Sequence, residues 1–389
     1  DIDDNMKVYG GSIIATNKSG GRALDIDDDL LVYGGSIVAT GEEYGIDVAD
    51  DFNIEGGTVS ATATGTNGAA LRIANNIDDI RTIGANGALT LNAATPVWND
   101  GSSPWLQKNN GKLTVYVDSV EEIDQFLDAG GTLGFVLRQD ITGTVTIPAG
   151  ADVTISGEHK FTGQISCAVA EDAAKTTRLT LDGLTLDGGG TQKMAVISQD
   201  QESKTVSGLE LTMNGCTVKN YTDKAVYLTN ATALSIDGCT FTNNATGDMD
   251  KPNTKGDYTI DLNLVSVDAG ELKITNSSFE GTCGDKAVIK VAARGGASDA
   301  DASDISGSAA TVEKLTVSGC TFSAEDSAAD LNIGTDNKTY SGIGEAPVNS
   351  TGSFAVSVSG NTTEVKINEA FKTYKNEDGN YIDTETGEA

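Results

Sequence analysis

The residues with the clearest chemical potential are aspartates that recur in a short N-terminal repeat. Residues 1–16 are DIDDNMKVYGGSIIAT, residues 25–40 are DIDDDLLVYGGSIVAT, and residues 47–62 are DVADDFNIEGGTVSAT. Carboxylates at this density are the hard oxygen ligands that calcium prefers, with six to eight oxygens at about 2.4 Å. The repeat therefore predicts calcium ions that bridge adjacent copies through Asp4, Asp27, Asp28, Asp29, Asp50 and Asp51.

Turn capping is the alternative role for the same aspartates. Asp and Asn side chains readily accept hydrogen bonds from backbone N–H groups in turns, and salt screens the repulsion between stacked carboxylates. A fourth, degraded copy begins RIANNIDDI at Arg72, where Asn75 and Asn76 stand in place of aspartates. This replacement fits either role, so both stay open at this point.

Tyrosines close to the aspartate turns are candidates for ligand binding. Tyr9 and Tyr33 each precede a Gly-Gly pair, so stacking of the two copies would place one ring above the other. Such a face suits a sugar ring, whereas an aromatic pair that only stabilises the sheet is the alternative. Tyr258 is the third candidate, in a predicted loop insertion at 245–260.

The elements that carry these residues are predicted to be short β-strands. Apolar residues alternate with polar or small ones in each copy, which indicates strands. The copies begin 22 to 25 residues apart, and three short strands in that length are typical of one coil of a parallel β-helix. The glycine pairs at 10–11, 34–35 and 56–57 are expected to turn the chain with positive φ.

A second repeat, with frames such as LTMNGCTV (211–218) and LSIDGCTF (234–241), occupies the C-terminal half. Its frames predict one inward-facing column made of Leu184, Cys216, Cys239, Ser277, Cys320 and Asn361. The five cysteines show no CxxC spacing, so neither a disulfide framework nor a zinc site is indicated. We interpret the cysteines as small buried apolar residues.

Four parts are expected along the chain: a first β-helical segment at 1–95, incomplete at its N-terminus, a linker or cap at 96–112, a second β-helical segment at 113–371, and a polar cap or linker at 372–389. Trp98 and Trp105 are expected to cover the end of the first segment, and a platform for a sugar ring is the alternative. Ser119 and Glu122 form a capping box, which predicts a short capping helix near 119–129. The second segment carries loop insertions at 245–260 and 293–311.

Composition excludes several classes of function. The 26 basic and 57 acidic residues give a net charge of −31, which repels nucleic acid and anionic membranes. The single histidine, His159, removes most histidine-based catalysis and histidine-rich metal sites. No stretch approaches the roughly 18 apolar residues of a membrane span. The chain begins within a repeat, so we expect a fragment of a larger exported protein, without membrane insertion in this fragment.

The chain resembles two known families. The N/D-G-C-T-F frames resemble the pectin-lyase-like right-handed parallel β-helix superfamily across about residues 113–370, which implies an all-β, right-handed parallel β-helix. The D-I-D-D-D and Y-G-G-S-I repeats of residues 1–80 resemble the bacterial β-helical carbohydrate-binding domain family, which implies binding of calcium and acidic plant polysaccharide. The Gly-His-Gly and Arg-Ile-Lys segments of polygalacturonase-type hydrolases are missing, and no lyase motif is recognised. No catalytic residue is assigned.

The expected function is that of a noncatalytic bacterial cell-surface module that binds a glycan, with calcium as the bridge to an acidic polysaccharide. One alternative is a surface adhesin whose loops bind a host protein such as an immunoglobulin. A second alternative is a polysaccharide lyase or glycoside hydrolase, because 57 acidic residues leave room for a catalytic carboxylate pair. The protein is expected to be extracellular and monomeric.

Overall fold

The chain forms two compact units, which are described separately. The first unit consists of residues 1–140 and 151–157, and the second of residues 141–150 and 158–389. The computed structural model describes residues 1–73, 81–99, 107–127, 131–198, 206–247, 258–265, 269–284, 287–294, 312–324, 329–333, 355–359, 373–375 and 381–383.

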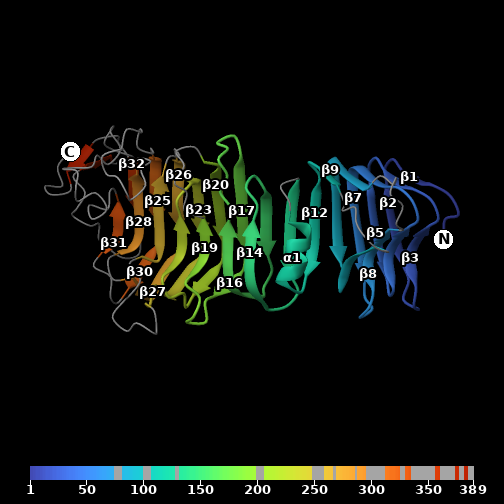
Figure 1. Cartoon of the computed structure of the whole chain (residues 1–389), viewed down its shortest axis with the longest axis horizontal. Coiled ribbons are helices and arrows are strands. Elements are labelled where there is room, and N and C mark those ends of the chain that lie inside the picture. Colours follow the sequence, from blue (N-terminus) through green and yellow to red (C-terminus); the bar gives the residue numbers. More distant parts are fainter. Residues whose placement is uncertain are drawn as a thin grey trace. The chain divides into compact units, whose positions relative to one another are not determined.

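The first unit is built from parallel strands in two sheets (Figure 1). One sheet contains the ladder β1–β4–β7–β9–β12–β13–β15. In the same sheet β2 pairs with β5, and β5 pairs with β7. The other sheet has the order β3–β6–β8–β10. The strands are β1 (Met6–Val8), β2 (Ser12–Thr16), β3 (Arg22–Ile26), β4 (Leu30–Val32), β5 (Ser36–Gly41), β6 (Tyr44–Val48), β7 (Phe52–Ala63), β8 (Ala69–Ile73), β9 (Arg81–Asn92), β10 (Thr95–Asn99), β11 (Gln107–Asn109), β12 (Lys112–Val117), β13 (Thr132–Leu137) and β15 (Asp152–Ser156).

The second unit repeats the same parallel stacking. One ladder runs β17–β20–β23–β26–β29–β32, and two others start from β16, which also pairs with β14. The strands are β14 (Ile141–Ile147), β16 (Lys160–Cys167), β17 (Thr176–Asp182), β18 (Thr185–Asp187), β19 (Met194–Ser198), β20 (Gly208–Asn214), β21 (Thr217–Lys219), β22 (Lys224–Leu228), β23 (Ala231–Asp237), β24 (Thr240–Asn244), β25 (Ile260–Val265), β26 (Ala269–Thr275), β27 (Ser278–Cys283), β28 (Ala287–Arg294), β29 (Val312–Ser318), β30 (Thr321–Ala324), β31 (Ala329–Ile333), β32 (Ala355–Ser359), β33 (Thr373–Lys375) and β34 (Tyr381–Asp383).

The core consists of apolar columns that run from coil to coil. Ile26, Val48 and Ile73 are register partners on β3, β6 and β8, and all three are buried. Leu30 lies opposite Phe52 in the same way. The alternation in each repeat therefore places every second side chain in the core, and the prediction of an all-β parallel β-helix is confirmed.

The glycine pairs allow the coils to approach closely. The second glycine of each pair, Gly11, Gly35 or Gly57, has φ between 82° and 89°. A Cβ atom on Gly35 would lie 2.7 Å from the backbone of Gly10 and Gly11, which leaves no room for a side chain. The expected positive φ is therefore found in all three pairs. In the third copy, however, β7 continues through residues 56–57 with a register shift, so this pair lies within a strand instead of ending it.

The short helix α1 (Val120–Phe126) confirms the capping signal. The Ser119 side chain accepts a hydrogen bond from the Glu122 N–H at 3.2 Å, and Glu122 accepts one from the Asp118 N–H at 2.8 Å. The helix ends before residues 128–130, which lie outside the described part. Among the described residues, no helix has the length and apolar character needed to cross a membrane.

The ladder of the first unit continues past the predicted linker. Leu113 on β12 lies opposite Leu89 on β9, while β11 and all of β10 except its first residue fall within 96–112. The division between the compact units falls further along the chain, near residues 140–158. The roles predicted for Trp98 and Trp105 concern side chains outside the described part of the structure.

Candidate functional site

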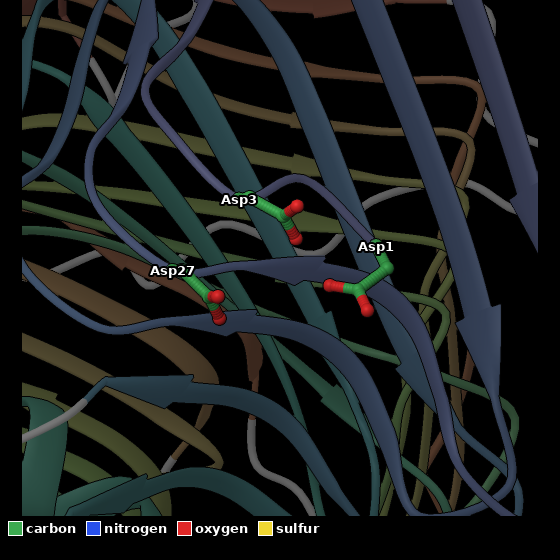
Figure 2. Close-up of side chains that lie close together, drawn as sticks. All are labelled: Asp1, Asp3 and Asp27. Carbon is green, nitrogen blue, oxygen red and sulfur yellow. The ribbon is translucent and has the colours of Figure 1, made fainter.

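The aspartate-rich turn of the first unit brings three carboxylates together (Figure 2). Ile2 pairs with Ile26, and because of this register Asp1 and Asp3 lie beside Asp27, which follows β3. One carboxylate oxygen from each aspartate lies within 4.8 Å of the other two, and all three side chains are exposed. These three residues are called the Asp1–Asp3–Asp27 cluster below.

The oxygens of this cluster are close enough together to make it a candidate site for a calcium ion. Two oxygens bound to one calcium at about 2.4 Å can be at most roughly 5 Å apart, and the three oxygens meet this limit. Calcium needs six to eight oxygen ligands, and water would complete the shell at an exposed site. Of the predicted metal ligands, only Asp27 belongs to the cluster. Asp1 and Asp3 were not predicted as ligands. Their alignment with Asp25 and Asp27 in the repeat could have identified them as candidates.

A second set of predicted ligands stacks next to the cluster. Asp28 lies between Asp4 and Asp50 of the neighbouring copies, and the Asp50 N–H donates to the Asp28 carbonyl at 3.2 Å. Partial desolvation, followed by the negative charges of Asp4 and Asp50, raises the pKa of Asp28. This column therefore has the charge density that a cation would relieve.

The remaining predicted ligands lie in a column of capped turns. Asn5 accepts a hydrogen bond from the Asp29 N–H through its side-chain oxygen at 3.2 Å. The Asp29 carboxylate accepts one from the Asp51 N–H at the same distance. In this column the side chains of Asn5 and Asp29 accept hydrogen bonds from backbone N–H groups of the next coil. This is the turn-capping role that the sequence left open.

Tyr9 and Tyr33 form a stacked pair on the surface. Their ring centroids are 5.0 Å apart and the ring planes differ by 9°. Tyr9 is 74% exposed and Tyr33 is 43% exposed. Ile14 and Val38, which pair across β2 and β5, are also exposed large apolar side chains. The predicted stacking is confirmed, and at least one ring stays accessible to solvent.

Tyr258 lies in a different environment from the one expected. Its side chain is 3% exposed, packs with Ala287, and has Lys290 Nζ 5.1 Å from the ring centroid. The ring is therefore inside the second unit, where a sugar in solution cannot stack on it. Most of the predicted insertions at 245–260 and 293–311 lies outside the described residues.

An ion-pair group on β3, β6 and β8 was not predicted from the sequence. Asp47 is buried and pairs with Arg22 at 2.9 Å and with Arg72 at 2.7 Å. Both guanidinium groups lie about 6 Å from the centroid of the Tyr44 ring. Arg72 occupies the repeat position of Asp25 and Asp47. This replacement of an acidic by a basic residue in the fourth copy could have identified the ion-pair group from the sequence.

The five cysteines are buried in the second unit, as their interpretation as small buried apolar residues predicts. The Cys216 N–H donates to Cys239 Sγ at 3.4 Å, and the Cys239 N–H donates to Ser277 Oγ at 3.1 Å, which confirms the predicted column for these residues. Asn361 lies outside the described part. All five thiols are buried, and burial raises the pKa of Cys167 to about 12 and that of Cys283 to about 11.

Comparison of the chain with protein-family models, with curated proteins and with solved structures gives no match. The structure therefore classifies the protein by its fold alone, as an all-β parallel β-helix.

Proposed function

We propose that the first unit is a noncatalytic module that binds an acidic glycan, with calcium as the bridge between protein and ligand. The observation that carries this proposal is the exposed Tyr9–Tyr33 stack. The apolar face of a sugar ring packs on an aromatic ring through dispersion and burial of apolar area. A contiguous exposed apolar surface is also typical of a binding site.

The position of the carboxylates supports the same proposal. Tyr33 follows Asp27 of the cluster by six residues, a chain length that spans at most roughly 20 Å. An oligosaccharide of a few units can span that distance. Because the protein carries a net charge of −31, it repels a polyanion unless a cation lies between them. Calcium at the Asp1–Asp3–Asp27 cluster supplies that cation and leaves coordination positions for glycan carboxylates.

The test is calorimetric titration of the protein with polygalacturonate, with a neutral plant glycan and with mucin glycans, in calcium and in EDTA. We expect binding of polygalacturonate in calcium and its loss in EDTA. No detectable binding of any of these glycans, in calcium or in EDTA, would overturn the proposal and would favour a protein ligand.

Matched variants separate the aromatic and acidic contributions. Tyr9→Ala with Tyr33→Ala is expected to weaken binding by about tenfold or more, equivalent to about 1.4 kcal/mol. Tyr9→Phe with Tyr33→Phe keeps the ring faces and should stay within about threefold of the parent. Asp3→Asn with Asp27→Asn should remove the calcium dependence of polygalacturonate binding. Asp182→Asn removes one exposed charge in the second unit and should leave this binding unchanged.

A further inference from the structure

A lysine and an aspartate are buried side by side in the second unit. Asp261 on β25 and Lys290 on β28 are register partners in adjacent parallel strands. Lys290 Nζ lies 3.4 Å from Asp261 Oδ1, and the two residues are 5% and 4% exposed. The buried Tyr258 ring lies 5.1 Å from Nζ.

The strand segments that carry this pair are buried. The residues on either side of the pair in sequence, Ile260, Leu262, Ile289 and Val291, are all buried, and they face the opposite side of the sheet. Burial of two opposite charges costs several kcal/mol per ion in desolvation, and the attraction between them offsets this cost only with excellent geometry. A neutral product made from the two groups would avoid that cost.

We propose that Lys290 and Asp261 condense to an isopeptide bond that joins β25 and β28 covalently. Proton transfer from the ammonium group to the carboxylate gives an amine and a carboxylic acid. Nζ then attacks Asp261 Cγ, the Nζ–Cγ bond forms, a proton passes from Nζ to the departing hydroxyl, and the Cγ–O bond breaks with release of one water. The step needs no oxidant or reductant, because an amine and an acid yield an amide and water.

Two physical effects favour this reaction at this position. The strands hold the nucleophile and the acid in contact, which gives an intramolecular reaction a high effective concentration, on the order of 10⁵ M or more when the alignment is good. Exclusion of water removes the solvent shell of both groups and opposes hydrolysis of the amide.

The second unit contains a natural control for this chemistry. Glu271 on β26 and Lys314 on β29 are also register partners, and Lys314 Nζ lies 3.8 Å from Glu271 Oε1. Their side chains are 52% and 50% exposed, so this pair matches the buried pair in register and separation but is hydrated. It is expected to stay an ordinary ion pair.

The test is the intact mass of the unfolded full chain, measured after purification and again after prolonged incubation at neutral pH. We expect a mass one water below that of the sequence, and a branched proteolytic peptide that joins β25 to β28. No branched peptide should join Glu271 to Lys314. Lys290→Arg is expected to restore the full sequence mass and to leave polygalacturonate binding by the first unit unchanged.

Two results would overturn the inference: a parent chain with the full sequence mass after incubation, or acetylation of the Lys290 amine in the unfolded protein. The mass of the parent decides the question even if Lys290→Arg fails to fold.

Discussion

At the residue scale, the aspartates of the first unit meet their neighbours in different ways. Asp29 accepts a backbone N–H of the next coil, and Asp47 is held by two arginines. Partial desolvation, followed by the charges of the carboxylates around it, raises the pKa of Asp28. A carboxyl group whose pKa is raised by folding binds its proton more tightly in the folded state, so ionisation of Asp28 destabilises the fold.

Asp28→Asn is therefore expected to raise the melting temperature at about pH 7 and to change it little at about pH 3, where the parent carboxyl is largely protonated. The contribution of a group with a raised pKa is present below its unfolded pKa and is lost as pH rises through its folded pKa. Thermal unfolding in EDTA across this pH range measures the effect. The exposed Asp182→Asn is the control, and an equal rise in both variants would contradict the prediction.

The Asp47 ion pairs give a second prediction at this scale. Arg72→Ala removes one of the two partners of a buried carboxylate and is expected to destabilise the protein by about 2 kcal/mol or more. Arg178 forms an exposed pair with Glu210, so Arg178→Ala should cost less than about 1 kcal/mol. Denaturant unfolding of the two variants makes the comparison, and similar costs would show that Arg22 alone neutralises Asp47.

At the element scale, the Gly-Gly pairs set how closely two coils approach. Gly11 and Gly35 have similar positive φ, 82° and 89°. A Cβ atom on Gly11 meets nothing within 4 Å, whereas one on Gly35 meets backbone atoms at 2.7 Å. We expect Gly11→Ala to cost about 1 kcal/mol through left-handed backbone strain. Gly35→Ala should cost about 2 kcal/mol beyond that, because β5 must move away from β2. Equal free energies of unfolding for the two variants would contradict this difference.

The strands and their inward columns were predictable because stacked coils repeat one pattern. A side chain such as Val48 must be apolar if its partners in the coils on either side are apolar, so the columns can be traced without the structure. The same reasoning located the stack of Tyr9 and Tyr33 and the column through Cys216 and Cys239.

Register and loop packing could not be predicted in this way. In the fourth copy, the column through Leu30 and Phe52 meets Arg81 instead of an apolar residue. The extra residues in the fourth copy shift its register relative to the third copy. They show no alternation of apolar and polar residues from which this shift could be predicted. Tyr258 was placed in a loop insertion because the repeat frames on either side of it are more than one coil apart, yet its ring is buried beside Lys290. Contacts between distant segments of this kind are not encoded in local periodicity.

At the scale of the whole molecule, negative charge is the dominant electrostatic property. The net charge of −31 is spread over a fold in which repeats stack like charges at successive coils. Adjacent coils are about 4.8 Å apart, where two unit charges repel by roughly 1 kcal/mol in water. Many weak repulsions of this size make stability depend on the ions in solution.

Salt and calcium are therefore expected to stabilise the protein through separable effects. Sodium chloride should raise the melting temperature gradually, because the screening length falls to about 10 Å at 0.1 M. At matched ionic strength calcium chloride should raise it further, through binding at the aspartate turns, and magnesium chloride should do so less, because magnesium dehydrates reluctantly. Two double variants locate the calcium ion. If it binds the Asp1–Asp3–Asp27 cluster, Asp3→Asn with Asp27→Asn should abolish the additional stabilisation by calcium. If it binds the adjacent column, Asp28→Asn with Asp50→Asn should abolish it instead. Identical curves for calcium and sodium chloride in the parent protein would show that the carboxylates are only screened, and glycan binding would then need a different bridge.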